Sequence, residues 1–131
     1  MLQEVVPTPQ HYTVLPATPH WVRGLFAWRG DIVVAIDLDA YLRGTDEPDL
    51  LQDSAMLLIT QHEHYTLGFY VPAIGTTVMI DATQIHAPTS GTEHPLPAIR
   101  PLLLGSYEQA WVIDIQAILT TIVQRIEVLV L

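Results

Sequence analysis

The stretch WVRGLFAWRGDIVVAIDLDAYL, residues 21–42, constrains the fold more than any other part of the chain. Two apolar runs flank an arginine–glycine pair, which predicts a β-hairpin with its turn at Gly30, because glycine readily adopts the backbone angles of tight turns. Gly24 interrupts the first run, so we expect a bend or bulge there. The second run, residues 32–36, is nearly continuous in β-branched residues, which is typical of a strand buried on both faces.

A short helical turn is expected directly after this hairpin. Asp37 or Asp39 can cap its start, and Gly44 can end it. The tripeptide Arg29–Gly30–Asp31 also invites a cell-adhesion interpretation, which requires an exposed loop of an exported protein. Nothing in the chain indicates export, and the flanking strands make the tripeptide a hairpin turn.

Short strands separated by turn residues recur along most of the chain. Acidic or Pro/Gly/Ser/Thr-rich stretches at 44–54 and 86–97 predict loops, and the first of them is expected to divide the fold into two halves. This pattern is typical of an all-β barrel or sandwich. Besides the hairpin strands 22–28 and 32–36, the expected strands are residues 13–15, 55–60, 65–71, 74–80, 99–104 and 110–113.

The end of the chain has helical periodicity. Its apolar residues recur at i, i+3, i+4, i+7, i+8 and i+11, one stripe of a 3.6-residue repeat, and Asp114 can cap the helix. Periodicity leaves open whether the tail IEVLVL, residues 126–131, extends this helix or forms a strand. The stripe consists of Ile115, Ile118, Leu119, Ile122, Val123 and Ile126.

Length and composition narrow the function classes. A chain of 131 residues fits one domain, and half of its residues are hydrophobic. The net charge of −9, with five arginines and no lysine, disfavours binding to nucleic acid or anionic lipid, since both need clustered cations. Cysteine is absent, and neither a signal peptide nor an apolar run of about 20 residues is found. We therefore expect a soluble, cytoplasmic protein without membrane insertion.

Residues 15–42, LPATPHWVRGLFAWRGDIVVAIDLDAYL, resemble the core of the CheW-like domain of bacterial chemotaxis. The shared features are a Pro-x-x-Pro approach, the VRGLF strand, the RG turn, a buried strand and IDL. The later segments YTLGFYVPAIGTTVMI and AWVIDIQAIL are similar to the family's central hairpin and closing strand. The resemblance implies a single CheW-like domain over residues 1–131. Its fold would be mainly all-β, with two SH3-like β-barrel subdomains and a C-terminal helix.

The resemblance also implies a noncatalytic adaptor that couples chemoreceptors to a CheA-type histidine kinase in chemotaxis or pilus-based motility. The receptor tip would enter a groove between the barrels, and a barrel surface would dock the kinase regulatory domain. Family members often have a Glu and an Arg where this chain has Glu4 and Arg29, so we expect a bridge between them. The expected partner-binding residues are Glu4, Trp28, Arg29 and Gly30. Trp21 and Trp111 are expected in the core.

Two departures from the family pattern stand out. The family has a strand hairpin before the segment that residues 2–6 resemble, and its absence would expose one barrel edge. The tail 126–131 filling the gap, a partner chain or homodimer supplying a strand, and a shortened chain are three open explanations. In addition, Val71–Pro72 stands where the family often has Val–Asp, so a surface acidic group is missing.

Metal binding and catalysis are the competing functions. His62 and His64 are weak zinc candidates, with His86 and His94 as unconstrained further ligands, although solvated histidines at a hairpin tip are the simpler interpretation. No serine lies in a nucleophile-elbow context and no phosphate-binding glycine motif is present, so we expect neither an enzyme nor a cofactor. A divergent CheW-like regulator acting through dimerisation, or a small metal- or ligand-binding β-barrel, remain the alternatives.

Overall fold

The chain divides into two compact units, Met1–Gly75 and Thr76–Leu131, in a computed structural model that describes residues 2–9, 11–44, 55–87 and 101–130. The expected division near residue 50 is wrong, because strands before the acidic stretch pair with strands after it. The predicted loops 44–54 and 86–97 lie almost entirely outside the described residues.

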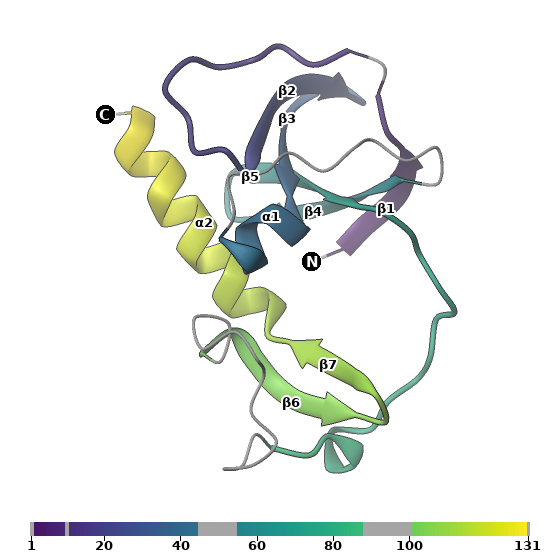
Figure 1. Cartoon of the computed structure of the whole chain (residues 1–131). Coiled ribbons are helices and arrows are strands. Elements are labelled where there is room, and N and C mark those ends of the chain that lie inside the picture. Colours follow the sequence, from purple (N-terminus) through teal and green to yellow (C-terminus); the bar gives the residue numbers. More distant parts are fainter. Residues whose placement is uncertain (1, 10, 45–54, 88–100, 131) are drawn as a thin grey trace. The chain divides into compact units, whose positions relative to one another are not determined.

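A five-stranded sheet forms the first unit, in the order β1-β4-β5-β3-β2. β3 and β5 run parallel, whereas the other neighbours are antiparallel. Figure 1 shows this sheet strongly twisted, with β1 and β2 as its outermost strands. The strands are β1 (Leu2–Pro7), β2 (Val22–Trp28), β3 (Asp31–Asp37), β4 (Met56–His62) and β5 (Tyr65–Val71).

The predicted β2–β3 hairpin is confirmed, and a glycine lies both in its turn and at its bulge. Arg29 and Gly30 form the turn with φ angles of 47° and 83°, the left-handed values of a two-residue hairpin turn. At Gly24, φ is 147° and the register shifts, which confirms the predicted bulge. A Cβ there would lie 2.6 Å from the Thr13 carbonyl oxygen. The expected strand at 13–15 reduces to a single bridge between Thr13 and Leu25.

Alternating residues of the sheet build a buried cluster in the first unit. It consists of Val33, Ala55, Leu57, Ile59 and Tyr70, with Val6, Phe26 and Trp28 packed against it. The prediction that β3 is buried on both faces is wrong at its start, because Ile32 is 65% exposed beside the buried Val33. Strand alternation produces this difference, since successive side chains point to opposite faces.

The predicted helical turn is α1 (Leu38–Arg43). Asp37 rather than Asp39 is its cap, since the Asp37 Oδ1 atom accepts a hydrogen bond of 3.0 Å from the Ala40 amide. Gly44 ends the helix in the left-handed conformation, with φ of 66°.

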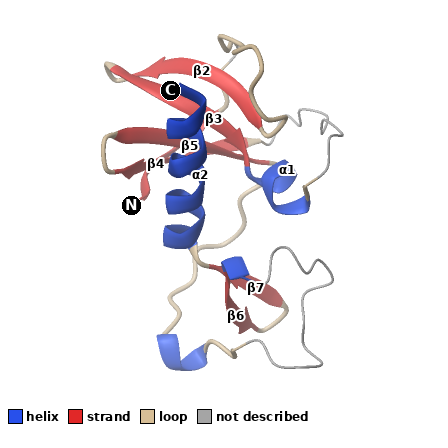
Figure 2. Ribbon diagram, turned by 90° about the vertical axis from the view of Figure 1, so that its left-hand side faces the viewer, coloured by secondary structure: helices blue, strands red, loops and turns tan. Residues whose placement is uncertain are grey.

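The second unit contains a hairpin and a helix. Figure 2 shows β6 beside β7, as their antiparallel pairing requires. The segment predicted as a strand at 99–104 instead begins its strand at Leu103, and its first two residues lie outside the described part. The predicted strand at 74–80 is wrong, because no strand forms there. The elements are η1 (Ala82–Gln84), β6 (Leu103–Tyr107), β7 (Ala110–Ile113) and α2 (Ile115–Val130).

The C-terminal helix is confirmed, and residues 126–130 extend it instead of forming a strand. The Asp114 Oδ1 atom accepts a 3.2 Å hydrogen bond from the Ala117 amide at its start. Four stripe residues are buried, namely Ile118, Leu119, Ile122 and Val123. A tail held in this helix leaves no strand to fill a barrel edge. Within the described residues, no helix is both long and apolar enough to span a bilayer.

Candidate functional site

The four predicted partner-binding residues lie at one end of the β2–β3 hairpin and on the facing part of β1. Arg29 donates a hydrogen bond of 3.1 Å from Nη2 to the Glu4 Oε1 atom. The same nitrogen lies 3.0 Å from Oε2, whose contribution is electrostatic because this second contact does not have hydrogen-bond geometry. The predicted bridge between Glu4 and Arg29 is therefore present.

This bridge connects the two edges of the sheet. Glu4 belongs to β1 and Arg29 directly follows β2, and these two strands are the outermost ones in the sheet order. The ion pair therefore links the two edge strands through their side chains, in addition to the apolar contacts of the buried cluster. The Arg29 side chain is 68% exposed and that of Glu4 is 34% exposed, so solvent screens the attraction.

Trp28 supports the Arg29 side chain, which lies next to it in the hairpin turn. The guanidinium carbon of Arg29 lies 4.9 Å from the centroid of the Trp28 ring, a cation–π geometry. Trp28 itself packs against the buried cluster, which fixes the surface on which the guanidinium rests. A left-handed φ is costly for arginine, so the turn stores about 1 kcal/mol of strain at Arg29. Together these contacts present an exposed, oriented cation beside an aromatic ring.

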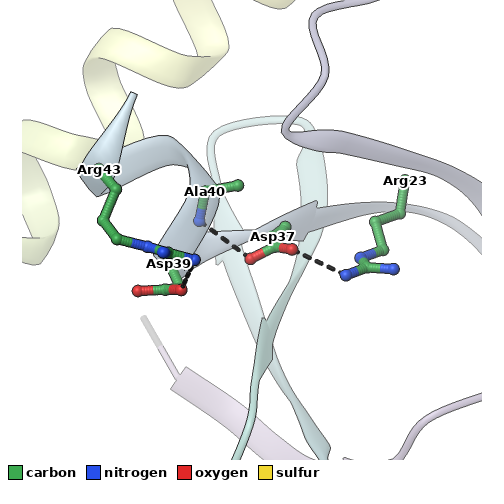
Figure 3. A network of polar contacts seen from close by, with 5 residues as sticks. All are labelled: Arg23, Asp37, Asp39, Ala40 and Arg43. Atoms are coloured by element: carbon green, nitrogen blue, oxygen red, sulfur yellow. Dashed lines mark hydrogen bonds and ion pairs between the residues drawn. The ribbon is translucent and has the colours of Figure 1, made fainter. Parts of the chain in front are cut away.

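A second arginine–carboxylate pair lies at the other end of the hairpin, and the sequence analysis missed it. Arg23 Nη2 and Asp37 Oδ2 are 2.8 Å apart, with the side chain of Asp37 only 4% exposed. Figure 3 shows Asp37 between Arg23 and the Ala40 amide, so one carboxylate both caps α1 and neutralises the arginine. Close by, Asp39 and Arg43 form an i,i+4 ion pair along α1.

Aromatic rings complete the environment of Arg23. Its guanidinium carbon lies 4.5 Å from the centroid of the Tyr70 ring. The hydroxyl groups of Tyr70 and Tyr12 are buried without a hydrogen-bond partner among the described residues. Burial raises the pKa of Tyr12, the positive charge of Arg23 lowers it, and Tyr70 raises it further, with a net increase. Asp37 and the aromatic rings thus make the Arg23 region a structural polar core.

The histidine candidates lie at a hairpin tip, as the simpler interpretation expected. His62 ends β4 and pairs with Tyr65, whereas His64 is in the turn after Glu63, whose φ is 55°. His86 forms a backbone bridge to Ser106 in the second unit. In the part of the chain that the structure describes, no group of three or more His, Asp, Glu or Cys side chains could hold a metal ion. His94 lies outside that part.

The three aspartates expected at helix starts have structural roles. Asp37 caps α1 and pairs with Arg23, Asp39 pairs with Arg43, and Asp114 caps α2. The core prediction for Trp21 is confirmed, since it is 4% exposed and packs edge-on to Tyr41 at 5.1 Å. Trp111, also predicted in the core, is only partly buried.

The described residues form a mainly β fold with a C-terminal helix, with Arg29 over the Trp28 ring at the end of the β2–β3 hairpin. The sequence model of the CheW-like domain matches residues 1–123, so the chain belongs to the CheW-like domain family. The fold is similar to the crystal structure of the scaffolding protein TtCheW from Thermoanaerobacter tengcongensis, with a TM-score of 0.65 and 23% sequence identity. The match covers 86% of this chain and 70% of that one. No curated protein sequence matches significantly.

Proposed function

We propose that this protein is a noncatalytic signalling adaptor that couples chemoreceptors to a CheA-type histidine kinase in the cytoplasm. The observation that carries the proposal is membership of the CheW-like family over residues 1–123. The likeness to a scaffolding protein supports a fold of SH3-like barrels, on which a protein can be bound without any chemistry.

The hairpin-end surface is our candidate docking site for the kinase regulatory domain. We define this surface by Glu4, Trp28, Arg29 and Gly30. It combines an oriented guanidinium and an indole ring, the two side-chain types that contribute most strongly to protein interfaces. Arg29 retains exposed donors beyond its contact with Glu4, so an incoming carboxylate or carbonyl group can bind without breaking the bridge.

Titration calorimetry tests the adaptor role directly. The wild-type chain is titrated with the regulatory domain of a CheA-type kinase, and separately with a chemoreceptor tip, both from the same source organism. We expect saturable binding to both with micromolar dissociation constants, about −8 kcal/mol in free energy. A chain that binds neither partner contradicts the proposal.

Asp39→Asn supplies a matched control for the charge at the hairpin-end surface. Asp39 is an acidic residue of the same unit, paired with Arg43 on α1. Removing its charge changes the net charge by the same amount as Glu4→Gln. We therefore expect Asp39→Asn to bind the kinase domain like the wild type, whereas Glu4→Gln weakens binding by releasing Arg29.

A further inference from the structure

Two buried tyrosine hydroxyls of the first unit have no hydrogen-bond partner among the described residues, and both side chains belong to the surroundings of Arg23. Tyr70 is 1% exposed, and Tyr12 is partly buried. A phenol hydroxyl both donates and accepts hydrogen bonds, so leaving it unpaired in the interior is unfavourable. Buried polar groups of this kind are normally paired with chain atoms or with an enclosed water molecule.

The two tyrosines reach the same part of the sheet from different elements. Tyr70 belongs to β5, where it pairs with Asp37 of β3, and its ring centroid is 4.5 Å from the Arg23 guanidinium carbon. Tyr12 belongs to the connection between β1 and β2 and lies beside the bulge, since a Cβ added at Gly24 would be 3.1 Å from the Tyr12 Cβ. Tyr12 is also close enough to Arg23 and Tyr70 for both to shift its pKa. Both hydroxyls therefore belong to one polar region around Arg23.

The charge balance of this region favours an uncharged ligand. Asp37 lies 2.8 Å from Arg23, so an anion would be attracted by the guanidinium and repelled by the carboxylate. Figure 3 shows one terminal nitrogen of Arg23 turned toward Asp37 and the other pointing away from it. A guanidinium carries five N–H donors, so Arg23 can donate to a ligand and keep its bond to Asp37. Water fits this set of groups, because it donates and accepts and makes about three hydrogen bonds when buried.

We propose that the first unit encloses a water molecule that bridges the hydroxyls of Tyr12 and Tyr70 and accepts a hydrogen bond from Arg23. This water links the β1–β2 connection to β5 by a polar contact, in addition to the edge-on packing of Tyr12 on Phe26, whose ring centroids are 5.9 Å apart. Releasing an ordered water gains entropy, which offsets the lost hydrogen bonds, so stability is a poor measure of the site. The number of enclosed waters measures it directly.

Magnetic relaxation dispersion of the water oxygen, measured on the full chain, counts the waters that stay bound for longer than the protein tumbles. Tyr70→Phe and Tyr12→Phe should each lower this count by one, since each removes one of the bridged hydroxyls. A high-resolution crystal structure of the wild type should place the water about 2.8 Å from both hydroxyl oxygens. Tyr107→Phe is the matched control, because it removes a partly buried side chain's hydroxyl from the second unit. It should keep the wild-type count.

An unchanged water count in either Tyr70→Phe or Tyr12→Phe overturns the proposal. So does a crystal structure in which a chain atom, instead of water, contacts the two hydroxyls. A bound anion overturns it as well, and would appear as a wild-type thermal midpoint that rises with chloride but not with gluconate at equal ionic strength. Circular dichroism should show that the variants are folded, and if one of them is not, the count in the other decides. None of these outcomes depends on kinase or receptor binding.

Discussion

Two arginine–carboxylate pairs flank the β2–β3 hairpin, and they differ in nearly every physical respect. Arg23–Asp37 lies at the end next to α1, at 2.8 Å, with side chains only 18% and 4% exposed. Glu4–Arg29 lies at the turn, at 3.0 Å, with side chains 34% and 68% exposed. Each arginine also contacts an aromatic ring, Tyr70 in the first pair and Trp28 in the second.

The difference teaches how one type of contact can serve stability at one place and recognition at another. A desolvated carboxylate cannot lose its partner without leaving a charge buried, so the Arg23–Asp37 pair constrains the fold. A solvated pair contributes little to stability but keeps an arginine oriented toward solvent. The buried pair therefore stabilises the fold, whereas partner binding at the exposed pair is our proposal.

Asp37→Ala should have the largest effect on stability. It leaves Arg23 partly buried without its carboxylate and removes the cap of α1. Breaking a buried pair costs about 3–5 kcal/mol, and the lost cap adds about 1 kcal/mol. Chemical denaturation, with the midpoint and slope compared with wild type, measures this loss. A cost below about 1 kcal/mol would show that the pair is not desolvated in solution.

Replacing both Arg23 and Asp37 by apolar residues separates the cost of an unpaired buried charge from the cost of the lost α1 cap. In Arg23→Met combined with Asp37→Leu, no buried charge remains, so much of the loss caused by Asp37→Ala should be recovered. The cap of α1 stays absent, and a residual cost of about 1 kcal/mol is expected. A double variant as unstable as Asp37→Ala would mean that the cap, not the charge, dominates.

Tyr12→Phe should have a moderate effect that appears only at alkaline pH. Burial raises the pKa of Tyr12 in the folded state above its ordinary value of about 10. The protonated phenol is therefore favoured by folding. Its stabilisation is complete below about pH 10 and is lost as the pH rises through the higher folded-state value.

The wild type should accordingly lose stability above pH 10 more steeply than Tyr12→Phe. At pH 7 the variant should be as stable as the wild type or slightly more stable, because the buried hydroxyl has no partner among the described residues. Thermal unfolding of both proteins at pH 7 and pH 11 measures the difference. Parallel pH profiles would contradict the burial of this hydroxyl.

Glu4→Gln should have the smallest effect on stability, about 0–1 kcal/mol, because water and salt screen the exposed pair. The difference between wild type and variant should shrink further in 1 M salt, where the Debye length is about 3 Å. Denaturation curves at low and high salt test this. A large, salt-independent loss would place Glu4 in the same class as Asp37.

The sequence predicted the exposed pair and missed the buried one, and the reason is physical. Glu4 and Arg29 were paired through resemblance to the family, and the glycine turn placed Arg29 at the hairpin end. Asp37 was recognised as a helix cap, a local signal. Its contact with Arg23 joins residues 14 positions apart on two different strands. Hydrophobic patterning does not report which polar side chains meet across a sheet.

Strand predictions succeeded where a neighbour exists. Residues 22–28, 65–71 and 110–113 form strands with the predicted bounds because each has a pairing partner. Residues 74–80 have equally strong strand composition but no partner among the described residues, and they remain irregular. Composition therefore predicts the capacity to form a strand, and tertiary pairing decides whether the strand forms.

The affinity of Arg29→Asn for a CheA-type kinase regulatory domain tests the central claim most directly. Asparagine tolerates the left-handed backbone of this turn, so the variant removes the guanidinium without straining the hairpin. We predict at least a tenfold weaker dissociation constant by calorimetry, about 1.4 kcal/mol, with a thermal unfolding midpoint within a few degrees of wild type. An affinity within twofold of wild type would contradict the assignment of partner binding to the exposed pair.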